Sequence, residues 1–175
     1  HIQNMKNRLD GDQGELEQYL DELADDLTQT DTSIQTGNVM ADAVLNSKLS
    51  VAEQKSIQLN VKAHIPKGIE MTDVEMCSVL GNLLDNAIEA CEKLPCDKRF
   101  LRVYIDKFKG QFYLSVQNSS PSIQRDKGIC RTTKAGTHGF GLFRIDRIAK
   151  KYGGYVNRQY EEGVFATELL LPLSG

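Results

Sequence analysis

The 175-residue sequence predicts an α+β fold, a two-layer α/β sandwich in which helices cover one face of a sheet. Three stretches repeat apolar residues with the 3.6-residue period of a helix, and several shorter stretches alternate apolar and polar residues as half-buried strands do. Strands joined by tight turns pair antiparallel, so helices gathered on one face of a largely antiparallel sheet are the expected arrangement.

Composition indicates one medium-sized globular domain with a short appendage, since 40% of the residues are hydrophobic and the formal net charge is −3. The mild acidity and the lack of a Lys/Arg stripe argue against a nucleic-acid partner. No apolar run reaches the roughly 18–20 residues of a membrane span, and the start does not read as a signal peptide. We therefore expect no membrane contact by this chain.

The cysteines predict reduced thiols in a cytoplasmic domain. The four are Cys77, Cys91, Cys96 and Cys130, and none forms a C-x-x-C pair. With only three histidines in the chain, a zinc site lacks both the spacing and the ligands that it needs.

Residues 1–30 predict two short amphipathic helices joined by an Asp- and Gly-rich turn at residues 10–14. Such a helical hairpin is too small to bury its own apolar stripe, so we expect it to pair with a second copy as a four-helix bundle. The alternative is that it packs back on its own domain. The predicted division is a hairpin over 1–30 and a larger domain over 31–175, joined by a polar linker.

A helix is expected from the N-cap Asn38 to about Lys55, followed by a half-buried strand over 57–65. The residues of this helix that we expect to face the core are Met40, Ala43, Val44 and Val51.

The central helix is expected over Thr72–Leu94, because Thr72 and Glu75 form a capping box ahead of an apolar run. Its predicted core stripe is Cys77, Leu80, Leu84, Ala87 and Cys91, flanked by Leu83 and Ile88.

The opposite face of that helix carries Asn82, Asn86 and Glu89, at i, i+4 and i+7. Asparagine is unfavourable inside helices, so two in register need a reason. One interpretation is a solvated polar face. The other is a set of oxygen ligands for Mg²⁺, which often completes its shell with water and substrate phosphates.

The second half of the chain predicts a strand hairpin turning at Lys109-Gly110, a polar loop over 119–137, a helix over about 139–152 and two closing strands. Gly153-Gly154 is expected to end the helix. At its start, Gly139 and Gly141 would let phosphate approach the unpaired N–H groups, although a plain loop-to-helix junction has the same pattern.

These motifs, in this order, resemble the ATP-binding domain of sensor histidine kinases in the gyrase, heat-shock-protein-90, kinase and MutL ATPase superfamily. The N box, N-L-L-x-N-A, stands here as Asn82-Leu83-Leu84-Asp85-Asn86-Ala87, and the G2 box, G-x-G-L, as Gly139-Phe140-Gly141-Leu142. Ile88-Glu89-Ala90 after the N box is similar to the AgrC-like peptide-receptor kinases. The resemblance implies a Bergerat-type fold.

A departure from the family lies in the G1 box, D-x-G-x-G, whose aspartate holds the adenine amine. Asn118 stands in its place, with Ser120 and Ser122 where the glycines would be. An Asn carbonyl accepts from the amine more weakly than a carboxylate does. The alternative is an ordinary strand-end Asn turn.

The resemblance implies ATP and Mg²⁺ as cofactors, with Mg²⁺ on Asn86 and Asn82. It further implies a lid over about 123–138, from which Arg131 and Lys134 would reach the phosphates. His138 would either donate to a phosphate or cap the helix, and Glu89 would assist the transfer.

The function implied is phosphoryl transfer from ATP to a histidine and relay to a response regulator, in a homodimer formed by the hairpin. The parent protein would be membrane-anchored, with this part in the cytoplasm. Three registers for the acceptor stay open. In the first, the acceptor histidine lies upstream of this chain. In the second, Gln3 occupies the acceptor position, and in the third His1 itself is the acceptor.

Two other functions are compatible with the sequence. One is a protein serine kinase of the anti-sigma-factor type, against which the hairpin argues. The other is a non-catalytic dimerisation module with a degenerate nucleotide pocket, which the altered G1 box favours.

Overall fold

The computed structural model of the protein describes residues 33–122 and 138–174, with the backbone alone for residues 138–140. The hairpin expected over 1–30 lies outside these ranges. The elements in chain order are α3 (Val39–Gln54), β1 (Gln58–Ala63), α4 (Asp73–Glu92), the short 3-10 helix η2 (Cys96–Lys98), β2 (Phe100–Phe108), β3 (Gln111–Ser119), α5 (His138–Lys151), β4 (Tyr155–Glu161) and β5 (Val164–Pro172).

The five strands form one mixed sheet in the order β1-β2-β3-β5-β4. β2, β3, β5 and β4 pair antiparallel, as expected, whereas β1 pairs parallel with β2. Parallel neighbours need a crossover connection, and α4 supplies it. The β2–β3 turn is the expected one, because Lys109 and Gly110 both have positive φ, at 50° and 76°, as a type I′ turn requires.

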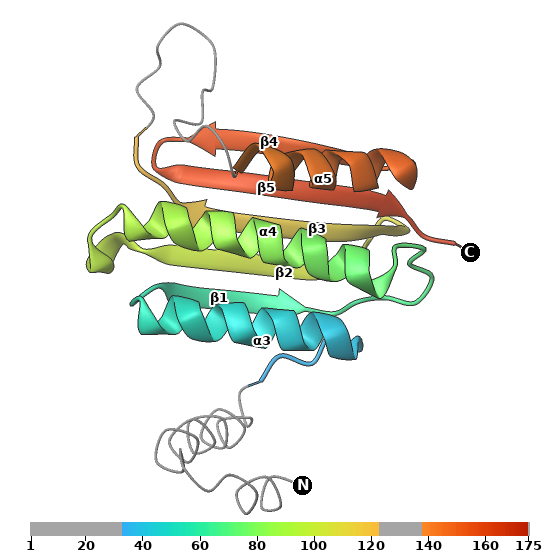
Figure 1. Ribbon diagram of the computed structural model, residues 1–175, viewed down its shortest axis with the longest axis horizontal. Helices are drawn as coiled ribbons and strands as arrows, with labels where there is room; N and C mark the ends of the chain where they lie inside the picture. Colours follow the sequence, from blue (N-terminus) through green and yellow to red (C-terminus); the bar gives the residue numbers. More distant parts are fainter. Residues whose placement is uncertain (1–32, 123–137, 175) are drawn as a thin grey trace, which may run out of the picture. The chain divides into compact units, whose positions relative to one another are not determined.

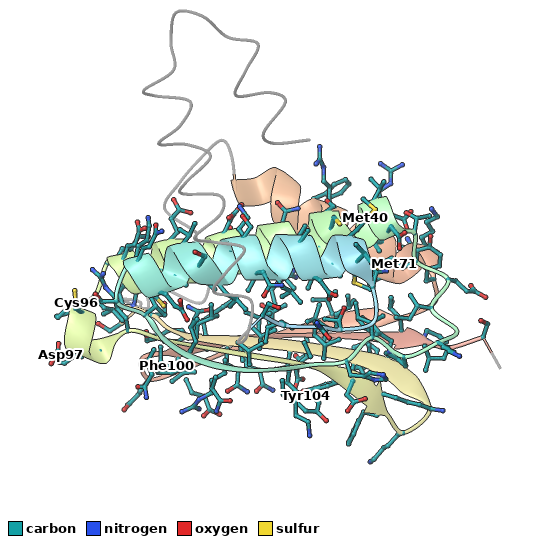
Figure 2. All side chains as sticks on the ribbon, turned by 90° about the horizontal axis from the view of Figure 1, so that it is seen from below. Met40, Met71, Cys96, Asp97, Phe100 and Tyr104 are labelled. Atoms are coloured by element: carbon teal, nitrogen blue, oxygen red, sulfur yellow. The ribbon has the colours of Figure 1, made fainter. Side chains whose placement is uncertain are left out.

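The three long helices lie side by side on one face of the sheet, which confirms the two-layer α+β prediction (Figure 1). α3 packs beside β1, α4 lies across β2 and β3, and α5 covers β4 and β5. The other face carries no helix in the described part of the chain, and Phe100 and Tyr104 point away from the helices there (Figure 2).

The core fills the space between the two layers with alternate residues of the strands. The fully buried strand residues include Leu101 and Ile105 on β2, Phe112 and Leu114 on β3, and Leu169 on β5. Ile145 and Ala149 of α5 join the same core from the helix layer. No helix in the described ranges is long and apolar enough to cross a membrane.

α4 begins as predicted. Thr72 is its N-cap and accepts from the backbone N–H of Glu75 at 3.2 Å, while the Glu75 carboxylate accepts from the Thr72 N–H at 3.2 Å. The expected stripe is buried except at one position, where Met76 takes the place of Cys77.

Of the residues predicted to turn inward from α3, Val44 packs against the core, but the prediction was wrong for Met40, Ala43 and Val51, which are exposed. Met40 is 46% exposed and Val51 37% exposed, and Met40 stands on the outer side of the helix layer (Figure 2). The buried row is Ala41, Leu45, Leu49 and Ala52. α3 carries apolar residues on both rows, and packing against β1 and α4 selects the second.

Candidate functional site

Two ion pairs join α4 to α3 and to the C-cap residue of α3, Lys55. Lys48 Nζ lies 2.7 Å from Asp85 Oδ1, and about two helical turns further along the chain Lys55 pairs with Glu92. Asp85 stands at the x position of the N-box pattern N-L-L-x-N-A. Asp85 thus faces α3, whereas Asn82 faces α5.

Asn82, Asn86 and Glu89 are half-buried rather than fully solvated. Asn82 donates to the Ser78 hydroxyl at 3.4 Å, within its own helix. The partial burial weakens the interpretation of this face as merely solvated, because amides kept from bulk water need polar partners.

Asn82 lies directly against the first turn of α5. A Cβ added at Gly141 would be 2.9 Å from Asn82 Oδ1 and 3.2 Å from its Cγ. Only glycine leaves room for this approach. The structure therefore brings together the amide-bearing helix and the glycine-containing segment, which lie far apart in the sequence.

α5 starts at His138, one residue before the predicted start, so Gly139 and Gly141 both lie in its first turn. N–H groups in a first turn lack partners within the helix, and the helix dipole makes that end electropositive. Leu142, beside them, is partly buried. The side chains of His138 and Phe140, like all of Arg131 and Lys134, lie outside the described residues.

Asn118 sits near the end of β3 on the helix-covered face and is only 3% exposed. Its Nδ2 donates to the Ser119 carbonyl at 3.0 Å. That leaves the carboxamide oxygen as the acceptor, and no donor in the described part of the chain reaches it. A buried amide with an available oxygen suits recognition of an amine.

Sequence reasoning missed Thr167, a buried polar residue on β5 that faces the helices from the strand next to Asn118. The signal was present, because Thr167 occupies an inward position in the alternation that contains Leu169 and Leu171. It places a hydroxyl diagonally across from Asn118.

The end of β3 is anchored by Ser119 and Cys91. Ser119 Oγ accepts from the Phe100 N–H at 2.9 Å, and the Cys91 thiol lies 3.5 Å from the same Oγ. Burial raises the pKa of the Cys91 thiol and outweighs its hydrogen bonds. Cys77, Cys91 and Cys96 are free thiols, as expected, and Cys130 lies outside the described residues.

The oxygen donor beside Gly141 is the Asn82 carboxamide, and Asn86 and Glu89 follow it at i+4 and i+7 along α4. In the residues that the structure describes, no three His, Cys, Asp or Glu side chains come together as metal ligands. Carboxamide oxygens suit Mg²⁺ that takes most of its shell from phosphates and water. The donor set present fits such an ion.

A family model described as the GHKL domain matches residues 70–172, which span α4 through β5. The chain belongs to the GHKL domain family.

Several curated relatives of the GHKL domain are sensor histidine kinases. NatK of Bacillus subtilis (strain 168) is 23% identical over 162 residues, which cover 88% of this chain and 51% of NatK. DcuS of Escherichia coli (strain K12) is 28% identical over 115 residues, covering 61% of this chain and 20% of DcuS. The chain spans about half the length of NatK and less of DcuS.

Solved structures share the fold. The catalytic domain of histidine kinase ThkA, in a nucleotide-free form, superposes with a TM-score of 0.61 at 21% identity, covering 79% of this chain and 93% of that one. The mycobacterial sensor histidine kinase MprB gives 0.58 at 18% identity over 75% of this chain and 94% of its own. The Bergerat-type arrangement of histidine kinase catalytic domains is therefore the fold of this GHKL domain.

Proposed function

We propose that this GHKL domain is the ATP-binding catalytic domain of a two-component sensor histidine kinase, which transfers the γ-phosphoryl group of ATP to a histidine. One observation carries the proposal: Asn82 on α4 lies against Gly141 in the first turn of α5. Carboxamide oxygens and a helix N-terminus side by side suit a triphosphate with its Mg²⁺.

Each end of the nucleotide has a candidate partner in this proposal. The oxygen of Asn118 accepts from the adenine amine, with Thr167 beside it. The N–H groups at Gly139–Gly141 hold the phosphates, flanked by Phe140, Leu142 and His138. Asn86, with Asn82, binds Mg²⁺, which when bound neutralises charge on the phosphates.

The transfer itself depends on position and charge. A nitrogen of the acceptor imidazole bonds to the γ-phosphorus in line as the bond to the β,γ-bridging oxygen breaks, and ADP leaves. Glu89 assists the transfer, while Lys134 and Arg131 offset the negative charge of the group in transfer. We place the acceptor histidine upstream of this chain.

The proposed whole protein is a homodimer of the AgrC-like group, joined through the hairpin of residues 1–30 and followed by the catalytic domain over 31–175. Its partner is a response regulator, and this part lies on the cytoplasmic side of a membrane-anchored parent. Support comes from the N-box continuation Ile88-Glu89-Ala90 and from relatives named as sensor histidine kinases.

The test is a calorimetric titration of the chain with ATP, with and without Mg²⁺. Micromolar to sub-millimolar binding that weakens without Mg²⁺ and in Asn86→Ala is expected. Asn60→Ala is the matched control, because Asn60 is exposed on β1 and should leave binding unchanged. An affinity for ATP that changes neither on removal of Mg²⁺ nor in Asn86→Ala would refute the metal role.

The altered G1 box favours one second candidate, a dimerisation module whose nucleotide pocket is degenerate. A folded chain that binds no ATP in the same titration would establish it. If ATP binds, the phosphoprotein formed with an acceptor segment separates the two kinase classes, since phosphohistidine is lost in acid and phosphoserine is retained.

A further inference from the structure

Glu75 joins α4 to α5 at the end of both helices that is remote from the glycine segment. Its Oε1 accepts from Lys151 Nζ at 2.6 Å, and its Oε2 accepts from the Tyr152 hydroxyl. The same Oε2 closes the capping box with the Thr72 N–H. One carboxylate therefore begins α4 and holds the last turn of α5.

The two helices run antiparallel (Figure 1) and pack against each other, with close side-chain contacts near both ends of the shared stretch. Glu75 meets Lys151 and Tyr152 at one point, and Asn82 meets Gly141 at the other. About two turns of α4 and three turns of α5 separate the points. A helix is a stiff rod over that length, so fixing one end of α5 fixes where its first turn lies.

We propose that Glu75 is a positioning residue, which with Lys151 and Tyr152 sets the register of α5 on α4 and so places Gly141 against Asn82. The consequence for nucleotide affinity rests on the proposed function. The consequence for helix register does not.

The surroundings of Glu75 distinguish this role from simple capping. Its side chain is 19% exposed, whereas that of Lys151 is 57% exposed, so the carboxylate lies inside the contact and the lysine covers it. Burial alone would raise the pKa of Glu75, but hydrogen bonds from Lys151, Tyr152 and the Thr72 N–H outweigh it and lower the pKa. Capping uses only the last of these three bonds.

Register can be measured directly with a cysteine pair, Asn82→Cys with Gly141→Cys. A Cβ at position 141 lies 3.5 Å from the Asn82 Cβ, at the lower end of the range of about 3.5–4.5 Å found across disulfides. Under mild oxidation the pair should close readily, and peptide mapping separates the new bond from any bond to the native cysteines.

Adding Glu75→Gln or Tyr152→Phe to the cysteine pair should slow closure about fivefold, because a charge-assisted hydrogen bond that fixes the register is lost. Two matched controls lie nearby. Lys150→Ala removes an exposed charge next to Lys151, and Tyr155→Phe removes the hydroxyl of a tyrosine that is 59% exposed. Neither control should change the closure rate.

In the chain without the cysteine pair, Glu75→Gln and Tyr152→Phe should weaken ATP binding by a similar factor at temperatures where all variants remain folded. Unchanged closure in both variants, or equal slowing in the controls, would overturn the positioning role. Slower closure in a chain that binds no ATP would leave that role intact and refute the proposed function instead.

Discussion

The closeness of Gly141 to Asn82 allows the candidate site to be tested with a single methyl group. In Gly141→Ala the new Cβ would lie 2.9 Å from Asn82 Oδ1 and 3.2 Å from Cγ. Comfortable separations between carbon atoms are about 3.5–4.0 Å. Either Asn82 rotates away or the first turn of α5 withdraws, and both movements disturb the proposed contact with nucleotide.

The expected change in stability is the balance of two effects. Alanine is favoured over glycine inside a helix by about 1 kcal/mol. Inserting a methyl group into a packed site costs about 1–3 kcal/mol. The free energy of unfolding should therefore fall by no more than about 2 kcal/mol. ATP binding should weaken about tenfold or more, which corresponds to a loss of about 1.4 kcal/mol or more of binding free energy.

The control is Gly81→Ala, also a helical glycine of this domain. A Cβ at Gly81 would meet nothing within 4 Å, so this variant should gain about 1 kcal/mol in stability and bind ATP as the parent does. Urea unfolding and calorimetric titration of both variants measure the two effects separately.

A double variant tests whether the Asn82 side chain is the cause. If the clash is real, Gly141→Ala combined with Asn82→Ala should lose less stability than the sum of the two single losses. The reasoning is refuted if Gly141→Ala is as stable as Gly81→Ala and binds ATP with unchanged affinity.

Three further predictions concern other parts of the fold. Gly154→Ala should lower the unfolding free energy by at least about 3 kcal/mol, because the new Cβ would lie 2.0 Å from the Leu170 carbonyl oxygen and backbone there cannot give way; thermal unfolding checks it. Asn118→Asp should lower the free energy of unfolding by about 1–3 kcal/mol at neutral pH, because it replaces the amide that donates to the Ser119 carbonyl with a charged oxygen. Urea unfolding at pH 7 measures this loss. The stability difference between the parent chain and Glu75→Gln should be full at pH 7 and shrink as pH falls below about 4, because the folded-state pKa of Glu75 lies below its unfolded value. Urea midpoints of the two proteins at several pH values follow that difference, and a difference independent of pH would contradict it.

Local sequence signals predicted α4 most completely. The capping box of Thr72 and Glu75 depends on residues three apart, so it can be recognised before the structure is known. The same holds for the Lys109-Gly110 turn, which needs positive φ at both positions. Features set by neighbouring residues are visible in a sequence because no tertiary contact decides them.

Tertiary contacts decided the features that the sequence could not predict. Apolar residues of α3 occupy two adjacent rows, and only packing on β1 and α4 selects Leu45 and Leu49 over Met40 and Val51. The contact of Glu75 with Tyr152 joins residues 77 positions apart, and no periodicity reports such a pair. The same is true of the approach of Gly141 to Asn82.

The altered G1 box looks less degenerate once the backbone after Asn118 is considered. Neither Ser120 nor Ser122 has a positive φ, so serine is accommodated there without strain. The segment is also held in place, because the Ser120 N–H donates to the Gly163 carbonyl at 2.8 Å and the Tyr160 hydroxyl donates to the Pro121 carbonyl at 3.0 Å. The backbone of Ser120 and Pro121 is thus tied to the end of β4 and the turn between β4 and β5, and Asn118 lies two residues before Ser120 at the end of β3. That arrangement holds the backbone after Asn118 in one place, as the proposed adenine contact requires.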